Sequence, residues 1–351
     1  MRLIQIGAGG FGRSWAELAA GATGVDLVAV VDPDPAARAW AGEALGFAPE
    51  ALAATPDEAF ARFEAEAALI VTPPPTHHSL ALAALAAGRH VLLEKPLATS
   101  LAEAREMIAA ADRASRVLMV SQNYRMRPAA RAARDFVRRG ALGGLVAVRV
   151  EFRRDTRALF PPGNFRYAMR HPLVLDMTIH HADLLRAITG QDVETVYARG
   201  WRVPDSPYAH DPAVVATMAL AGGATVVYDG DWATRGAETS WNGDWEFIGE
   251  RGRLRWTGDA ADALGGVVTL EPAGEPARTL EFSASDQVVS DRPASLAAFR
   301  RAVETGAEPE TAARDNIRSL AIVLACVESI ERGDVVAVGG AEPCSRPPSS
   351  S

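Results

Sequence analysis

The sequence predicts a two-domain α/β protein in which a doubly wound parallel sheet precedes a second α/β domain with a large, mostly antiparallel sheet. A chain of 351 residues is longer than one hydrophobic core usually serves. Residues 1–121 alternate short apolar runs with alanine-rich helical patterns, as βαβ units do. From Leu145 onward, apolar and polar residues alternate with a period of two, which indicates antiparallel strands. We therefore expect domains at 1–121 and 122–340, with a disordered tail at 341–351.

Five short apolar runs predict the strands of the first domain: residues 3–6, 27–31, 68–71, 90–93 and 117–120. Helix starts with polar N-cap residues lie between these runs, and two of the starts carry the glutamate of a capping box. They are Asp34-Pro35, Thr55-Pro56-Asp57-Glu58, and Ser100 with Glu103. Thr72-Pro73-Pro74-Pro75 can neither continue a strand nor easily begin a helix. The chain should therefore turn out of the sheet there, at its ligand-binding edge.

The second domain should hold strands on five alternating runs: residues 146–152, 193–203, 214–220, 224–228 and 245–248. Helical periodicity covers 173–189, 294–304 and 312–331. In the last of these helices, an apolar stripe falls on one face, and this helix should close the domain. The stripe consists of Ile317, Leu320, Leu324 and Val327.

Charge and hydropathy exclude several kinds of partner. The chain carries 36 basic and 44 acidic residues, and no stretch gathers arginines into a stripe that could follow phosphates, so nucleic acid is not expected to bind. The longest apolar runs, such as 81–87, are far shorter than the ~20 residues that span a bilayer. Because the N-terminus also lacks a signal peptide's apolar core, we expect a cytoplasmic protein. The two cysteines, Cys326 and Cys344, do not suggest a disulfide framework.

A glycine-rich turn, Gly7-Ala8-Gly9-Gly10-Phe11-Gly12, follows the first predicted strand and opens a helix. In a Rossmann domain, such a turn and the helix N-terminus hold a dinucleotide pyrophosphate. Asp32 ends the second strand, where an acid accepts hydrogen bonds from ribose hydroxyls; the alternative is a simple turn residue. Pro33 and Asp34 offer no guanidinium for a 2′-phosphate. These residues favour NAD over NADP.

A second group of polar residues lies in the predicted helix 173–189. Asp176 and His180 are four residues apart and share a helical face, with Asp183 one turn further. A carboxylate beside an imidazole suits proton transfer, although a capping or packing pair is the alternative. His77-His78 and His180-His181 also permit a metal interpretation, but no cysteine or carboxylate cluster accompanies them. We therefore expect no metal.

Lys95 is the one lysine among the 36 basic residues, and it lies in Glu94-Lys95-Pro96. An ammonium group can lose a proton at accessible pH, whereas a guanidinium cannot. A lysine kept in an arginine-rich chain therefore suggests a position where arginine cannot serve. The alternative is that this lysine is present by chance.

On these motifs the chain resembles the glucose-fructose oxidoreductase and inositol dehydrogenase family, Gfo/Idh/MocA. The most specific segment is 87–96, which ends in Glu94-Lys95-Pro96. Further resemblance lies in the glycine-rich turn, in Val71-Thr72-Pro73 followed by His77, in Asn123-Tyr124-Arg125, and in Asp315-Asn316 with the final helix. The resemblance covers nearly the whole chain.

The resemblance implies that Lys95, Asp176 and His180 are catalytic. Together with the motifs above, it implies cofactor contacts from Gly7, Gly9, Gly10, Phe11, Gly12, Asp32, Thr72, Pro73, His77, Glu94, Lys95 and Asn123. Substrate contacts would come from Lys95, Tyr124, Arg125, Tyr167, Asp176, His180 and His181.

Two departures from the family pattern alter the expected pocket wall. Arg170-His171-Pro172 replaces a glycine-rich approach to the second domain's first long helix, and Thr178 stands where glycine is common. A substrate therefore cannot be carried over from a particular sugar or inositol dehydrogenase. Extra polar groups could face a polyol or an anionic substrate, or could lie on the surface; these are Arg125, Arg127, Arg166, Tyr167 and His181.

The expected function is hydride transfer between NAD and a secondary alcohol of a sugar-like or polyol-like substrate bound between the domains. His180, or Lys95, would take the hydroxyl proton, and Asp176 would orient the base. Lysine's ordinary basicity favours the role of hydrogen-bond donor for Lys95. The alternatives are an NAD-dependent, redox-neutral glycosidase or lyase and a non-catalytic NAD-binding protein. By resemblance, the broad second-domain sheet is expected to form a homodimer or homotetramer.

Overall fold

The computed structural model describes residues 1–258, 265–280 and 291–339. Its contacts divide the chain into two compact units. The first comprises Met1–Asn123 with Arg292–Ile317, and the second comprises Tyr124–Asp291 with Arg318–Ser351. The expected disordered tail and Cys344 lie outside the described residues.

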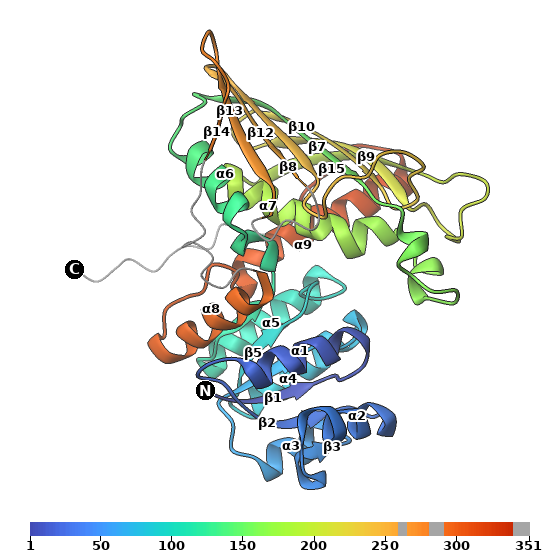
Figure 1. The fold of residues 1–351 in the computed structure, drawn as a ribbon, viewed down its shortest axis with the longest axis vertical. Helices are drawn as coiled ribbons and strands as arrows, with labels where there is room; N and C mark the ends of the chain where they lie inside the picture. Colours follow the sequence, from blue (N-terminus) through green and yellow to red (C-terminus); the bar gives the residue numbers. More distant parts are fainter. Residues whose placement is uncertain (259–264, 281–290, 340–351) are drawn as a thin grey trace. The chain divides into compact units, whose positions relative to one another are not determined.

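The first unit is built on a parallel sheet of six strands in the order β3-β2-β1-β4-β5-β6 (Figure 1). The strands are β1 (Arg2–Ile6), β2 (Asp26–Val31), β3 (Leu52–Ala53), β4 (Ala67–Ile70), β5 (His90–Leu93) and β6 (Leu118–Val120). The five predicted strands are confirmed within one residue at each end. Only β3, which is two residues long, was not predicted. The strand order reverses between β1 and β4, and ligands of such sheets bind beyond the carboxyl ends of the strands at this reversal.

Helices cover this sheet, and three of them begin at the N-caps that the sequence predicts. They are α1 (Gly10–Gly21), α2 (Pro35–Leu45), α3 (Pro56–Arg62), α4 (His77–Ala86), α5 (Leu101–Ala114) and α8 (Asp291–Thr305), with short 3₁₀ turns at Pro49–Ala51 and Pro74–Thr76. Asp34, Thr55 and Ser100 each accept a hydrogen bond from a backbone amide of the helix that follows. Such caps each stabilise a helix by about 1 kcal/mol. The three predicted N-caps are therefore confirmed, because each side chain forms the expected capping hydrogen bond.

The C-terminal part of the sequence contributes to the core of the first unit. Leu296 and Phe299 of α8 are buried in the same apolar cluster as Leu3 and Trp15. Residues Arg292–Ile317, which the sequence analysis assigned to the second domain, thus group with the first unit.

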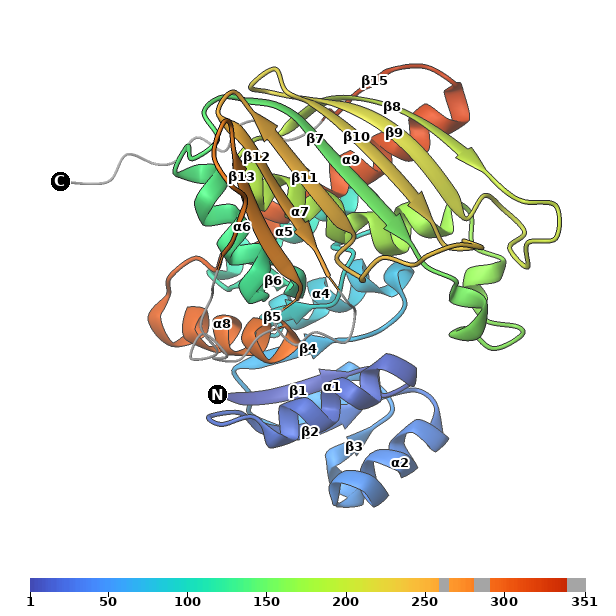
Figure 2. The ribbon, with the colours of Figure 1, turned by 45° about the horizontal axis from the view of Figure 1, so that its top comes forward.

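The second unit contains a mixed sheet of nine strands in the order β14-β13-β12-β11-β7-β10-β9-β8-β15 (Figure 2). The strands are β7 (Leu145–Arg153), β8 (Val193–Trp201), β9 (Ala213–Leu220), β10 (Thr225–Asp231), β11 (Asp244–Gly249), β12 (Gly252–Thr257), β13 (Val267–Pro272), β14 (Arg278–Thr279) and β15 (Val336–Ala337). Strands β7 and β10 are parallel neighbours, and the other pairs are antiparallel. The predicted mostly antiparallel sheet is confirmed, although the sequence analysis did not predict β12 to β15.

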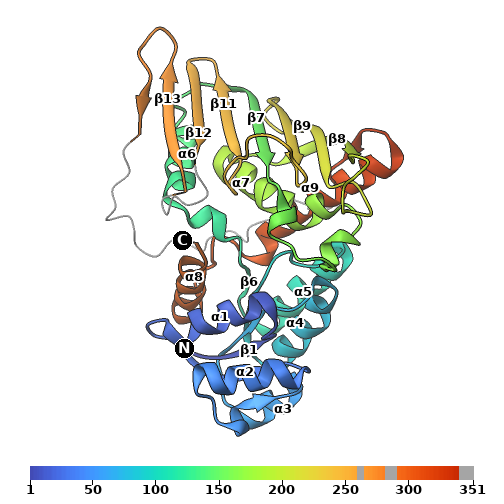
Figure 3. The same cartoon turned by 45° about the vertical axis from the view of Figure 1, so that its right-hand side comes forward.

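Helices α6 (Pro128–Arg138), α7 (Ile179–Thr189) and most of α9 (Ala313–Arg332) pack on one face of this sheet (Figure 3). Alternate residues of β7, such as Val148 and Phe152, are buried, whereas Arg149 between them is exposed. The predicted helix 173–189 is interrupted near its start, because Val174–Thr178 forms a π-helical turn that carries Asp176. Such π turns often occur at functional sites. None of the described helices combines the length and apolar character needed to cross a membrane.

Candidate active site

The glycine-rich turn of the first unit needs its glycines for close backbone approach. Gly7 has a φ of +99°, and a Cβ atom there would lie 2.1 Å from the backbone oxygen of Val71. A Cβ atom on Gly12 would lie 2.5 Å from the backbone oxygen of Gly7. The Gln5 side-chain amide donates to the carbonyl oxygens of Gly7 (2.8 Å) and Gly12 (2.7 Å) and holds the turn closed. The loops after β1 and β4 therefore touch where the strand order reverses.

The N-terminus of α1 offers backbone amides to a ligand. Its N-cap residue, Gly9, makes no side-chain cap. Positions 9 and 10 also have open space where a Cβ atom would lie, with no heavy atom within 4 Å. An uncapped helix end with room for close approach suits a pyrophosphate, whose charge the helix dipole stabilises. These residues fit a dinucleotide.

Asp32 lies at the carboxyl end of β2 and is 9% exposed. Its carboxylate accepts hydrogen bonds from the Ala8 amide (2.7 Å) and the Asp34 amide (2.9 Å), so it is fixed beside the glycine-rich turn. The structure also places Arg38 here, because its Nη1 donates to the backbone oxygens of Asp32 (2.6 Å) and Pro33 (3.0 Å). The two residues that follow Asp32 offer no guanidinium, but the helix after them thus brings one to the backbone of Asp32.

The loop that carries Lys95 is fixed by its neighbour Glu94. One Glu94 carboxylate oxygen accepts a hydrogen bond from the Trp15 indole (2.8 Å) and the other from the Lys95 backbone amide (3.0 Å). Burial raises the pKa of the Glu94 carboxyl, and the nearby Lys95 charge opposes this shift. The Lys95–Pro96 peptide is cis. Through these two hydrogen bonds, the buried Glu94 side chain links the Lys95 backbone to Trp15 of α1.

His77, predicted to contact the cofactor, is completely buried. Its Nδ1 lies 2.8 Å from the Pro96 carbonyl oxygen and its Nε2 lies 2.9 Å from the Thr72 carbonyl oxygen. Burial lowers the pKa of this imidazole, and a neutral ring donates from only one nitrogen. His77 can therefore affect a cofactor only through the two loops that it joins.

Arg292 is a residue at this site that the sequence analysis missed. Its Nη1 donates to the Ser14 hydroxyl (2.8 Å), and its guanidinium lies 4.7 Å from the centre of the Phe11 ring. Both partners belong to the first turns of α1. Arg292 adds a positive charge close to the glycine-rich turn, from a position 278 residues away in sequence.

In the second unit, the His180 ring stacks on Tyr124 with 4.3 Å between ring centres. The Arg127 guanidinium lies 3.7 Å from the centre of the Tyr124 ring and is ion-paired with Asp291 at 2.7 Å. His180 is 6% exposed, so the stack limits the positions that its ring can take. Two of the predicted site residues, Tyr124 and His180, are thus brought together.

Asp176 lies in the π-helical turn and forms an ion pair with Arg166, with 2.5 Å between Oδ2 and Nε. The Asp176 charge also affects the Tyr124 ring that stacks on His180. Burial is the largest cause that raises the pKa of Tyr124. Asp291 and Asp176 raise this pKa further, and Arg127 lowers it. Asp176 thus acts electrostatically on the residue that supports His180.

Three other predicted substrate residues have structural partners. Arg125 is buried and makes a two-point ion pair with Asp183, at 2.5 and 2.6 Å. His181 is also buried, with its Nδ1 2.9 Å from the Tyr228 hydroxyl, and burial lowers its pKa to about 4. Tyr167 donates its hydroxyl hydrogen to the Phe160 carbonyl oxygen (2.8 Å). These partners hold the three side chains in place, and their predicted contact with substrate stays a prediction.

Other candidate chemistries find no support in the part of the chain that the structure describes. There, no group of three or more His, Cys, Asp or Glu side chains is placed to hold a metal ion. Cys326 is buried, and burial raises the pKa of its thiol to about 12, so it is not a reactive thiolate.

The fold and the glycine-rich site define a dinucleotide-binding protein, and comparison with known proteins identifies an oxidoreductase. A family model described as "Oxidoreductase family, NAD-binding Rossmann fold" matches residues 1–122, and one described as "GFO/IDH/MocA C-terminal domain" matches residues 130–255. The chain belongs to the GFO/IDH/MocA oxidoreductase family, and NAD is its cofactor.

Similar proteins extend along nearly the whole chain. D-apiose dehydrogenase of Paraburkholderia graminis is 31% identical, over 94% of this chain and 88% of that protein. 1,5-Anhydro-D-fructose reductase of Ensifer adhaerens is 28% identical, over 95% of this chain and 97% of that protein. A crystal structure of an oxidoreductase from Agrobacterium radiobacter in complex with NAD+, L-tartaric acid and magnesium has a TM-score of 0.84 and 25% identity, covering 97% of this chain and 98% of that one.

Proposed function

We propose that this protein is an NAD-dependent dehydrogenase that oxidises a secondary alcohol of a sugar, a polyol or a related small molecule. The observation that carries the proposal lies in the first unit. Lys95 follows β5, and the glycine-rich turn and Asp32 follow β1 and β2, so all three lie at the carboxyl edge of one parallel sheet. A cationic hydrogen-bond donor at this edge of the sheet can stabilise the substrate oxygen while the alcohol is oxidised to a carbonyl. Relatives named as apiose dehydrogenase and anhydrofructose reductase support the substrate class.

In the proposed reaction, the substrate carbon loses a hydride and its hydroxyl group loses a proton, which leaves a carbonyl group. NAD supplies the hydride acceptor. His180 accepts the proton at a ring nitrogen, Asp176 favours the charged form of that ring, and Lys95 donates a hydrogen bond to the oxygen. The stack on Tyr124 supports this role because it fixes the plane of the His180 ring.

A turnover screen tests the proposal. The purified protein is incubated with NAD and a panel of polyols, aldoses and sugar acids that includes myo-inositol, D-apiose and L-tartrate, and absorbance of the reduced cofactor is followed. We expect at least one compound to give NADH, and Lys95→Met to abolish that signal. Release of a leaving group without net NADH would favour the redox-neutral glycosidase or lyase. Tight NAD binding without turnover of any compound would favour a non-catalytic protein.

We also propose that the protein acts in the cytoplasm as a homodimer or homotetramer, with the outer face of the second sheet as the interface. Exposed valines on two neighbouring strands support this assignment: Val215 of β9 and Val227 of β10. Arg149 of β7, the register partner of Val227, is ion-paired with Glu246 of β11. Light scattering at several protein concentrations measures the assembly. Replacing Val227 with Glu should dissociate it, and a monomeric wild type would contradict the assignment.

A further inference from the structure

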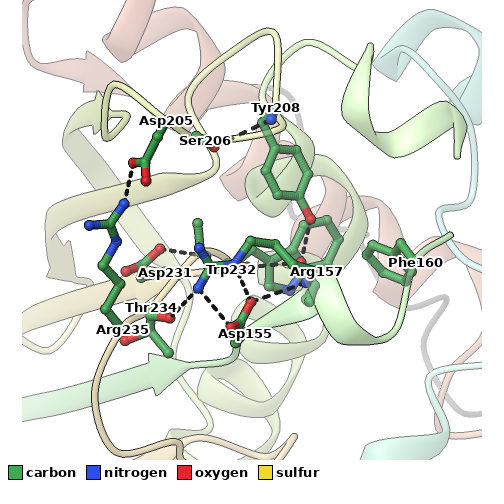
Figure 4. Close-up of polar contacts among 12 residues, drawn as sticks. Asp155, Arg157, Phe160, Asp205, Ser206, Tyr208, Asp231, Trp232, Thr234 and Arg235 are labelled. Carbon is green, nitrogen blue, oxygen red and sulfur yellow. Dashed lines mark hydrogen bonds and ion pairs between the residues drawn. The ribbon is translucent and has the colours of Figure 1, made fainter. Parts of the chain in front are cut away.

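A small lobe of the second unit is built around the loop that follows β7. We define this lobe as residues 154–169, 202–212 and 231–235. Arg157 binds both carboxylate oxygens of Asp155 at 2.7 Å each (Figure 4). The hydroxyl of Thr156 donates to the Trp232 carbonyl oxygen (2.8 Å) and is hydrogen-bonded to the Tyr208 hydroxyl. These contacts tie the start of the loop to the segments after β8 and β10.

Aromatic packing fixes the rest of the loop. The Tyr208 ring stacks on Trp232, and the Phe160 ring meets Trp232 edge-on with 5.7 Å between ring centres. Tyr167 packs edge-on against Tyr208, and its backbone oxygen accepts a hydrogen bond from the Ala209 amide (2.7 Å). Trp232 and Tyr208 are almost completely buried. Both ends of the segment from Phe160 to Tyr167 are therefore held.

The lobe presents Arg166 to Asp176. The Arg166 guanidinium lies 4.8 Å from the centre of the Phe160 ring and 4.6 Å from that of Phe165. Its Nε reaches Asp176 Oδ2 at 2.5 Å, and the side chains of Arg166 and Asp176 are only 25% and 16% exposed. A charge-assisted hydrogen bond that is partly shielded from water is stronger and better oriented than an exposed ion pair.

We infer that Arg166 is a positioning residue for catalysis, which acts by fixing the orientation and the negative charge of Asp176. This inference rests on the proposed function, in which Asp176 supports the proton-accepting His180. A guanidinium that acts through Asp176 should lose its influence when the carboxylate is absent. A guanidinium that contacts substrate directly should keep its influence in that case. The two possibilities therefore differ in a double-mutant cycle.

The cycle combines Arg166→Met with Asp176→Asn and measures kcat and KM on the panel compound with the highest turnover. Arg166→Met should lower kcat by about tenfold or more with little change in KM, and Arg166→Lys should restore part of the loss. In the Asp176→Asn background, Arg166→Met should have no further effect. The matched control is Arg332→Met, because Arg332 also belongs to the second unit, is exposed and is paired with Glu328; it should behave as wild type. Additive losses, or a rise in KM alone, would overturn the inference.

A measurement that needs no turnover separates the inference from the proposed function. NMR of ¹⁵N-labelled histidine, assigned with His180→Gln, follows the His180 ring in the NAD-bound protein. Arg166→Met should move the His180 signals, whereas Arg332→Met should leave them in place. NAD affinity and thermal unfolding verify that each variant is folded. Unmoved His180 signals would overturn the role of Arg166, whereas a wild type that oxidises no compound would overturn the proposed function.

Discussion

The glycine-rich turn of the first unit and the stacked pair Tyr124 and His180 of the second unit are built in different ways. In the first unit the chemistry depends on backbone: the open amides of α1 and the close approach of Gly7 to Val71 follow from a short sequence motif. In the second unit it depends on side chains from distant parts of the chain, such as Tyr124 on His180. Backbone chemistry can therefore be recognised in a sequence, whereas the partners of side chains have to be found in the structure.

The largest expected effect concerns Lys95, which the motif and the structure both place at the cofactor edge. Lys95→Arg should lower turnover by at least about a hundredfold and leave NAD affinity nearly unchanged, because a bulkier planar guanidinium cannot replace a compact donor. Lys95→Met should be at least as inactive. Turnover and calorimetric NAD affinity are measured for both variants. An arginine variant with most of its activity would show that the lysine is not required.

In the second unit, the neighbouring residues His180 and His181 should differ sharply. His180→Ala should lower turnover by at least about a hundredfold without loss of NAD affinity, as expected for a lost proton-transfer group. His181→Ala should be milder in turnover but less stable, because His181 is buried against Tyr228 and the Phe152 ring. Kinetics and thermal unfolding of both variants measure these differences in turnover and stability. Greater loss of turnover from His181→Ala would mean that the wrong histidine is assigned to catalysis.

The pH dependence of stability tests the buried state of His181. Because burial lowers its pKa from 6.5 to about 4, the unfolded chain binds a proton between these pH values that the folded chain does not. The free energy of unfolding should therefore fall as pH drops through this range, by about 3 kcal/mol for this residue. Denaturant unfolding of wild type and His181→Gln at a series of pH values isolates the contribution. If the free energies of unfolding of the two proteins changed in parallel with pH, the predicted contribution of His181 would be contradicted.

A smaller effect is expected in cofactor preference. NAD should bind several-fold more tightly than NADP, because Asp32 would repel a 2′-phosphate. Arg38, held by the backbone oxygens of Asp32 and Pro33, should reduce this preference. Arg38→Ala should therefore widen the difference between the two affinities, and Asp32→Ala should narrow it, as measured by calorimetry. Equal or tighter binding of NADP by the wild type would refute this role of Asp32.

The sequence predicted much of the first unit because its signals are local. Capping residues such as Ser100, and the apolar strand runs, depend on neighbours a few residues away. Strands such as β12 and β13 were missed because their pairing is decided by strands elsewhere in the sheet. The glycine-rich turn and Asp32 could also be predicted from the sequence, because their signals are local like those of the caps.

Residues with distant partners could not be placed in this way. Arg125 was predicted to contact substrate, which stays a prediction, but its pairing with Asp183, 58 residues away, had no local signal. Arg292 showed no local signal of its contact with Ser14. Arg166 was named only as one of several possible polar groups, because its pairing with Asp176 depends on the packing of the lobe around Tyr208 and Trp232.

Direct observation of hydride transfer tests the central claim. The protein is incubated with NAD and a substrate from the panel that carries deuterium on the oxidised carbon, and both products are analysed by mass spectrometry. We expect one deuterium in the reduced cofactor for each ketone formed, and no transfer by the Lys95→Met variant. Deuterium retained in a product that has lost a leaving group, with no labelled NADH, would contradict it.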